Sequence, residues 1–246
     1  MRPAGDGQPG WPTQPHERRD HVPVGAREPV IRRRVAVELI VLVLATAAFL
    51  MVFPRRPFFV DVGLALLAGT LLLLDARHTR DAIWGQFPCA VDERSRRRRT
   101  ILLVGPVTGL IVLCFLGTGI ALGTLEGGWA TASQRIGNPR LLLVLAIYLP
   151  WALLQQILFQ FYLLGRLCTL LPVPVAVTGT GVAYALVHLP DLRITLVTAI
   201  AGVFWSGVYF RYRSLAPLAF SHAVLGATYY YWVSGQDLAG QWMTRW

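Results

Sequence analysis

The sequence has few charged residues and no lysine at all. Charged residues make up 15% of the 246 positions and hydrophobic residues 54%, whereas a typical soluble domain carries about 25% charged residues. The charges also crowd into a few stretches and leave long apolar blocks between them. This pattern indicates an integral membrane protein with one membrane domain and argues against an ordinary soluble domain.

Cysteine is scarce as well, which limits what the chain can bind through sulfur. Cys89, Cys114 and Cys168 have no metal-ligand spacing, and two of them lie inside apolar segments. We therefore expect free thiols, with no disulfide framework and no cysteine-based metal site.

All 23 basic residues are arginines, and the formal net charge is +10. Because these arginines flank apolar blocks, membrane topology and anionic lipid headgroups explain them better than nucleic acid does. With the N-terminus inside, seven arginines fall in the N-terminal tail and seven in the 76–100 loop, and Arg166, Arg211 and Arg213 fall on the same side. This bias predicts a cytoplasmic N-terminus, and the arginine content is compatible with a bacterial cytoplasmic membrane.

Residues 1–34 are rich in proline, glycine and arginine and contain no apolar core. The missing apolar core excludes a cleaved signal peptide, and the composition predicts a disordered, basic cytoplasmic tail. The apolar stretches that follow approach the length of about 20 residues that a membrane-spanning helix needs. They predict an all-α, polytopic transmembrane helix bundle of about seven spans, at residues 35–53, 58–75, 101–122, 141–169, 173–190, 194–210 and 215–233.

The bundle divides into two parts. Residues 35–122 are expected to form the N-terminal transmembrane helices, with a tight turn at Phe53–Pro57 joining the first two spans into a hairpin. Residues 141–233 are expected to form a core that carries the polar side chains described below, and residues 234–246 a short C-terminal tail. The aromatic run Tyr229–Trp232 at the end of the last span is typical of an interfacial belt.

Three glutamines lie in the middle of a predicted span, where polar side chains are costly. Gln156 and Gln160 are four residues apart and share one helix face, and Gln155 lies about 100° round the helix from Gln156. We expect these amides to point toward protein or water. Taken alone, they are most simply interpreted as interhelical hydrogen-bonding groups, each bond worth about 0.6–2 kcal/mol.

Two histidines also lie in predicted spans, His188 near the end of the fifth and His222 within the seventh. A single buried histidine is more often a satisfied core residue, but two histidines and three glutamines in one small bundle favour a functional site. Neutral imidazole accepts a proton near physiological pH, and its protonated form stabilises an oxyanion. The other three histidines fall in polar tail or loop segments and are expected to be solvated.

Other kinds of site fit the sequence less well. Neighbouring helical residues project about 100° apart, so Ser221 and His222 do not form a local serine–histidine dyad, and a Ser206–His222 pair across helices remains a weaker alternative. Two histidines supply half of a tetrahedral zinc set, and amides replace carboxylates poorly. The sequence therefore indicates no particular cofactor, and a divalent metal stays possible but unsupported. Asp191, three residues after His188, is expected to cap a helix at the interface.

The order and spacing of these residues resemble those of the CAAX-protease and bacteriocin-processing family, also called the Abi family, which includes the type II CAAX prenyl endopeptidases. Members carry an EExxxR motif, then an FxxxH motif, then a histidine followed four residues later by asparagine or a similar residue. The text FQFYLLGRL here is also similar to the family's FRGFLLGRL, and the resemblance covers roughly residues 141–233. The matching positions are Gln155, Gln156 and Gln160 as QQxxxQ, Tyr184 and His188, and His222 and Gly226.

The resemblance implies the fold and chemistry of an intramembrane peptidase. It implies that Gln155 and Gln156 stand at the water-activating carboxylate positions, that His188 assists, and that His222 faces the oxyanion. These four residues are the expected catalytic set.

The resemblance also implies a binding set. Gln160 stands where the family has arginine, Tyr184 where it has phenylalanine and Gly226 where it has asparagine. We expect these three residues to contribute to binding.

The departures from the family pattern bear directly on catalysis. An amide cannot accept a proton as a general base, and base catalysis is typically worth about 10²–10⁴-fold in rate. The arginine is lost together with the glutamates, which is chemically coherent because a buried arginine without a carboxylate partner is costly. Either His188 alone is the base, or the chain no longer hydrolyses peptides.

Two functions of different classes remain. The first is an intramembrane endopeptidase, with its catalysis either intact or impaired, that acts on membrane-associated or prenylated peptides. The alternative is a non-catalytic pseudo-peptidase that binds membrane-embedded or lipidated peptides. A small transporter or assembly factor is less favoured, because the sequence has no internal repeat and no paired intramembrane charges. In either leading case the partners are membrane lipid and a peptide, with no nucleic acid.

Overall fold

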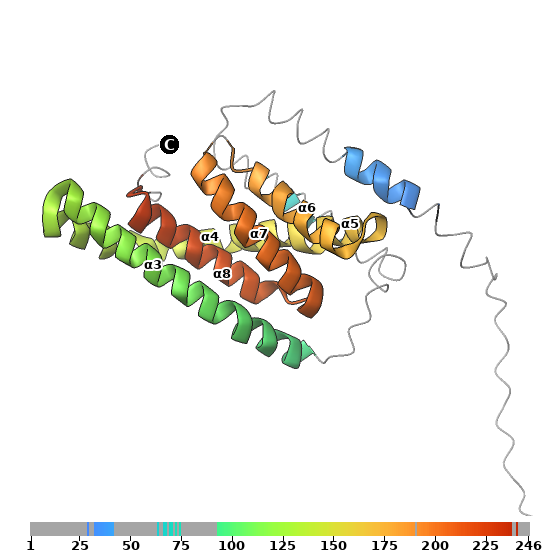
Figure 1. The fold of residues 1–246 in the computed structure, drawn as a ribbon, viewed down its shortest axis with the longest axis horizontal. Coiled ribbons are helices and arrows are strands. Elements are labelled where there is room, and N and C mark those ends of the chain that lie inside the picture. Colours follow the sequence, from blue (N-terminus) through green and yellow to red (C-terminus); the bar gives the residue numbers. More distant parts are fainter. Residues whose placement is uncertain are drawn as a thin grey trace, which may run out of the picture.

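The computed structural model describes residues 32–41, 93–189 and 191–237 and the isolated positions 29, 63, 66, 67, 69, 70, 72, 74 and 240. These residues form helices and the turns between them, with no strand in this part of the chain, and the helices pack together as a bundle (Figure 1). The all-α helix bundle expected from the sequence is therefore confirmed. The elements are α3 (Glu93–Ile136), α4 (Arg140–Gln156), the π-helix η2 (Ile157–Leu163), α5 (Leu164–Leu170), α6 (Val173–Leu186), α7 (Leu192–Tyr212), α8 (Leu215–Thr228) and the π-helix η3 (Tyr229–Val233).

Helix α3 extends beyond both ends of the span predicted at 101–122. From Glu93 to its break it is about 51 Å long at 1.5 Å per residue, well over the hydrocarbon thickness of about 30 Å. The backbone leaves the helical conformation at Gly127 and Gly128, and Gly128 has a φ of 74°, which glycine adopts without side-chain strain. Beyond this break the chain turns back on itself, at the left end of α3 in Figure 1.

The span predicted at 141–169 is one continuous helical stretch made of α4, η2 and α5. It begins after Pro139 and ends at Leu170. The next residue, Leu171, has an extended backbone (φ −126°, ψ 154°), as favoured before a proline. The middle of the stretch is π-helical, with backbone hydrogen bonds from i to i+5. Nothing in the sequence pattern predicts this π-helical segment.

Helix α6 ends at Leu186, short of the predicted span end at 190, and a turn follows it. The turn precedes a proline, which disfavours continuation of the helix. Asp191 then caps α7, because its carboxylate accepts hydrogen bonds from the backbone N–H groups of Arg193 at 3.0 Å and Ile194 at 3.2 Å. The capping role expected for Asp191 is confirmed.

The core lies where α6, α7 and α8 meet α3 and the η2 segment. Glycines let α6 and α7 approach closely: a Cβ atom at Gly202 would lie 3.0 Å from Cα of Gly181 and 3.1 Å from the ring of Tyr184. The small residues thereby hold Tyr184 against α7. The buried core residues are Val104, Phe159, Leu164, Ala176, Tyr184, Trp205, Val208, Tyr209 and Leu218.

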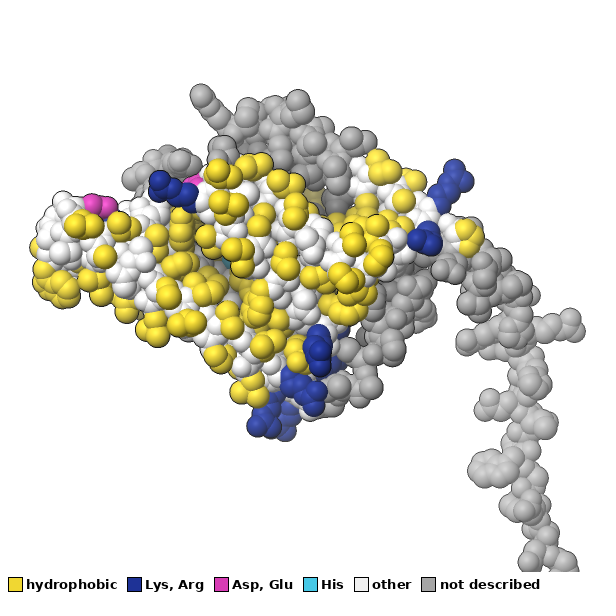
Figure 2. All heavy atoms as spheres, in the orientation of Figure 1, with side chains coloured by type: hydrophobic (Ala, Val, Ile, Leu, Met, Phe, Trp, Pro, Cys, Tyr) yellow, Lys and Arg dark blue, Asp and Glu magenta, His cyan; other side chains and the backbone are white. Residues whose placement is uncertain are grey.

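The outer surface of the bundle is apolar and indicates lipid contact. Leu142 is 72% exposed and Ile200 is 76% exposed, and hydrophobic side chains cover much of the face shown in Figure 2. Among the described residues, the helical stretches 94–136, 140–170 and 192–212 are long and apolar enough to cross a membrane, and α6 is a shorter apolar helix. The protein is therefore an integral membrane protein, since this surface would be costly in water.

The count of seven spans stays a prediction. The spans expected at 35–53 and 58–75, and the turn at Phe53–Pro57 between them, lie mostly outside the described residues. So do residues 1–28, the larger part of the expected tail.

A helical segment at residues 32–41 packs against α5. Val35 and Leu39 are buried on it, against leucines at 163, 167 and 170. Beside them Arg166 is fully buried, with its Nε atom 3.4 Å from Oε2 of Glu38 and its guanidinium 4.0 Å from the centre of the Tyr162 ring. The N-terminal segment thus supplies a carboxylate to a cation buried in the core.

Candidate functional site

A cavity of about 410 Å³ opens between α3, α4, α6, α7, α8 and η3. Most of its wall is apolar, as expected for a site that takes up an apolar group. Among the described residues, no acidic side chain lines it. Its polar side chains are Thr108, Tyr148, Tyr184, His188, Thr198, Ser221, His222, Tyr229 and Tyr230.

Tyr184 and His222 form a hydrogen-bonded pair at this cavity. The hydroxyl of Tyr184 lies 2.8 Å from Nε2 of His222 and 3.3 Å from Nδ1. Both side chains are buried, and the indole ring of Trp205 lies 5.1 Å from the imidazole ring, centroid to centroid. The pair therefore links α6 to α8 in a water-poor setting, where a hydrogen bond is electrostatically strong.

His188 contacts the same tyrosine. Its Nδ1 atom lies 3.0 Å from the backbone carbonyl oxygen of Tyr184, one helical turn earlier. Because a carbonyl oxygen only accepts hydrogen bonds, Nδ1 carries the proton and the lone pair of the neutral ring is on Nε2. The rings of Tyr184 and His188 lie 5.3 Å apart, centroid to centroid. Tyr184 therefore contacts both histidines.

Tyr148 and Gly226 complement each other in shape at the cavity wall. The Tyr148 ring lies edge-on to His222, with 5.6 Å between centroids and 87° between planes. A Cβ atom at Gly226 would lie 2.5 Å from Cε1 of Tyr148, closer than van der Waals contact allows. Glycine at 226 thus leaves the space that Tyr148 occupies beside His222.

The three glutamines do not line the cavity that the histidines line. Gln156 and Gln160 are fully buried, and within the described part of the chain their amide atoms, and Oε1 of Gln155, have no hydrogen-bond partner. Gln155 lines a second cavity of about 150 Å³, and none of the three lines the larger cavity. Phe159 lines the smaller cavity and lies 5.1 Å from Tyr184 of the larger one, ring centre to ring centre.

Comparison with known proteins gives one match, to a family model. Residues 137–228 match the family model described as type II CAAX prenyl endopeptidase Rce1-like. Residues 137–228 therefore resemble an Rce1-like domain. No curated protein and no solved structure matches the chain.

The Rce1-like domain contains every residue of the expected site, from Gln155 to Gly226. The match confirms the resemblance to CAAX proteases. It does not include α3 or η3, which nevertheless supply Thr108, Tyr229 and Tyr230 to the cavity wall. The cavity of the Rce1-like domain is therefore completed by flanking helices.

Two π-helical segments shape the site, and neither was expected. Segment η2 carries Gln160, and η3 carries Tyr229 and Tyr230 into the cavity wall. Tyr231, in the same aromatic run, donates a hydrogen bond of 2.7 Å to Asp237. The run interpreted from sequence as an interfacial belt thus also lines the site. Short π-helices are often found at functional sites.

The serine alternatives gain no support from the geometry. The Ser221 hydroxyl lies 2.7 Å from that of Thr108 on α3, and the Ser206 hydroxyl donates to the carbonyl of Gly202 at 2.7 Å. Each serine is therefore paired with a group other than His222. Among the described residues, no group of three or more histidine, cysteine, aspartate or glutamate side chains is placed to hold a metal ion.

Sequence reasoning missed the aromatic residues around His222. Tyr148 and Trp205 lie in apolar spans, where aromatic residues are usually interpreted as core packing residues. The signal that could have found Tyr148 is its hydroxyl, a polar group within a predicted span that needs a partner or a cavity.

Proposed function

We propose that this protein is a membrane-embedded, CAAX protease-like endopeptidase that acts on membrane-associated or prenylated peptides with reduced catalytic power. One observation carries the proposal: His188 and His222 both contact Tyr184 and both line one apolar cavity. Two imidazoles at a single water-poor cavity provide a proton acceptor and an oxyanion partner without a carboxylate.

The cavity suits the apolar part of such a substrate. Its wall includes Ile111, Phe115, Val197 and Leu225, which come from three different helices. A lipid chain or an apolar peptide side chain would gain free energy from burial there, at roughly 25 cal/mol per Å². The scissile carbonyl would then lie toward His188 and His222.

In the proposed reaction, Nε2 of His188 takes a proton from water as the water oxygen attacks the scissile carbonyl carbon. The hydrogen-bonded Tyr184–His222 pair stabilises the negative oxygen of the tetrahedral intermediate. When the carbon–nitrogen bond breaks, His188 returns the proton to the leaving amine. The hydroxyl group remains on the new carboxyl product, and the enzyme is restored.

Gln155 and Gln156 would act on water or peptide and not as bases. Their amides cannot take a proton, so we expect the rate to fall short of a carboxylate-based enzyme by about 10²–10⁴-fold. The unpartnered amide atoms of Gln156 and Gln160 are places for an ordered water or a peptide backbone group, because buried polar atoms are seldom left unsatisfied. Gln155, Gln156, His188 and His222 are thus the proposed catalytic set, with Gln160, Tyr184 and Gly226 in binding.

A second candidate function is a pseudo-peptidase that holds a membrane peptide without cutting it. The observation that favours it is that the glutamines do not line the histidine cavity, and that no described acidic residue lines it. A neutral amide set binds peptide N–H and C=O groups well but activates water poorly.

The proposal extends to placement in the cell. We propose a bacterial cytoplasmic membrane with the N-terminus cytoplasmic, supported by the arginine excess at the N-terminal tail and at the start of α3. We also propose that residues 141–233 form the working core, residues 35–122 the N-terminal membrane helices and residues 234–246 a short tail.

The test is cleavage of a panel of prenylated and membrane-spanning peptides by the purified full-length protein, alongside the Gln155→Glu/Gln156→Glu variant. The endopeptidase proposal expects slow cleavage by the wild type and faster cleavage by the variant. Binding without cleavage by the wild type, with cleavage restored in the variant, would favour the pseudo-peptidase. If neither the wild type nor the variant binds or cleaves any peptide of the panel, both functions are contradicted.

A further inference from the structure

Five arginines crowd into the first two turns of α3, between Arg94 and Arg99. The positive end of the helix dipole lies at this N-terminus, so cations are disfavoured there unless an anion compensates them. The side chains of Arg97, Arg98 and Arg99 are exposed, and no described residue pairs with them. The positive charge of this cluster is therefore available to a binding partner other than the described residues.

The position of the cluster along α3, relative to the apolar surface of the helix, indicates which part of the membrane it meets. The lipid-facing apolar surface of α3 begins at Ile101 and Leu102, both exposed. Arg97–Arg99 precede Ile101 by about 3–6 Å along the helix axis, at 1.5 Å per residue. The headgroup zone on each side of the hydrocarbon is about 5–7 Å thick. A membrane whose hydrocarbon begins at Ile101 therefore places this part of α3 at the level of the lipid phosphates.

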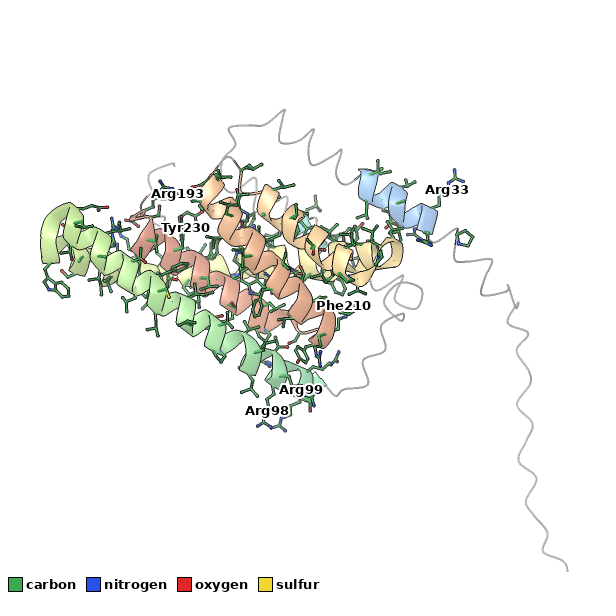
Figure 3. All side chains as sticks on the ribbon, in the orientation of Figure 1. Arg33, Arg98, Arg99, Arg193, Phe210 and Tyr230 are labelled. Carbon is green, nitrogen blue, oxygen red and sulfur yellow. The ribbon has the colours of Figure 1, made fainter. Side chains whose placement is uncertain are left out.

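A second helix brings another cation to the same end of the bundle. Figure 3 labels Arg98 and Arg99 at the start of α3 and Phe210 near the end of α7, and α3 packs against α7. Arg211 follows Phe210 and is exposed. In Figure 2, arginine side chains, drawn in dark blue, gather at this lower end, next to the hydrophobic surface. The charged area thus borders directly on lipid-facing surface.

We propose that Arg97, Arg98 and Arg99, assisted by Arg211, form a binding surface for the phosphate groups of anionic phospholipids. A guanidinium donates two parallel hydrogen bonds to a phosphate, which a lysine ammonium does not. A zwitterionic phospholipid presents the same phosphate together with a cation, so its net charge does not compensate the cluster. The surface anchors the start of α3 at the interface, independently of any peptidase activity.

The experiment is titration of the full-length protein, delipidated in neutral detergent, with phosphatidylglycerol and, separately, with phosphatidylcholine. We expect phosphatidylglycerol to bind at least about tenfold more tightly. We expect the variant R97Q/R98Q/R99Q to lose affinity for it on the order of 100-fold, since each arginine contributes about a factor of five. The variant R97K/R98K/R99K, which keeps the charge without the planar fork, should lose only part of the affinity.

The matched control is Arg193→Gln, because Arg193 is exposed at the other end of α7 and is labelled far from Arg98 and Arg99 in Figure 3. This control should bind like the wild type. If the triple variant does not fold, Arg98→Gln alone should bind about fivefold more weakly. Equal affinity of the wild type and the arginine variants would overturn the proposal, as would equally tight binding of inorganic phosphate. Neither result would bear on peptide cleavage.

Discussion

The hydroxyl of Tyr184 on α6 lies 2.8 Å from Nε2 of His222 on α8, and both side chains are buried. The same tyrosine accepts the Nδ1–H of His188 through its backbone carbonyl at 3.0 Å. One residue thereby sets the orientation of both imidazole rings. This arrangement makes Tyr184 the positioning residue of the site.

Replacing Tyr184 by phenylalanine tests that role. The variant should be less stable by about 1–3 kcal/mol, because the buried imidazole of His222 loses its partner. Denaturant unfolding in detergent measures the difference. Tyr229→Phe is the matched control, since Tyr229 lines the same cavity and its hydroxyl has no hydrogen bond to a described residue. Equal stability of the two variants would count against the Tyr184–His222 bond.

Substitution at Gly226 tests the fit of Tyr148 beside His222. Gly226→Ala should cost about 1–3 kcal/mol of stability, because the added methyl group overlaps the Tyr148 ring. Thermal unfolding of the purified protein reports the loss.

The control for this prediction is Gly207→Ala, at a helical position with nothing within 4 Å of the new Cβ. That variant should be neutral or more stable by up to about 1 kcal/mol. Adding Tyr148→Ala should recover part of the stability of Gly226→Ala, a coupling that a double-mutant cycle measures. Independent effects of the two changes would contradict the packing described.

The buried cation Arg166 predicts a strong dependence on Glu38. Glu38→Gln should destabilise the protein on the order of 3 kcal/mol, because it removes a carboxylate from a pair whose cation is fully buried. The comparison is Glu126→Gln, because the Glu126 side chain is 55% exposed in its pair with Arg135, and exposed pairs contribute about 0–1 kcal/mol. Similar losses in both variants, measured by denaturant unfolding, would show that Arg166 does not rely on Glu38.

Much of the fold follows from composition and length alone. The predicted spans 141–169, 194–210 and 215–233 correspond to helical stretches of the structure, because an apolar run long enough for the hydrocarbon must satisfy its backbone hydrogen bonds within the helix. The early end of α6 could be read from the proline that follows it. The extension of α3 could not, since its ends lie among polar residues that are equally compatible with a loop.

Several residues singled out from the sequence lie at one cavity, whereas the position of the glutamines relative to it was not predictable. The histidine motifs placed His188, His222, Tyr184 and Gly226 at one cavity, as the resemblance suggested. The glutamines were expected nearby on an α-helical face, but the helix is π-helical directly after Gln156, which changes the direction of its side chains. Helix packing and π-helical segments depend on contacts between helices. The hydrophobic periodicity of a single helix carries no information about those contacts.

The most direct test of the central claim, that the two histidines form a working peptidase site, is cleavage by the His188→Ala variant. Product formation from a prenylated peptide would be followed by mass spectrometry for the wild type, His188→Ala and His16→Ala, a histidine in the polar tail. The account predicts cleavage by the wild type and His16→Ala, and loss of about 10²-fold or more in His188→Ala. Cleavage at the wild-type rate without His188 would contradict it.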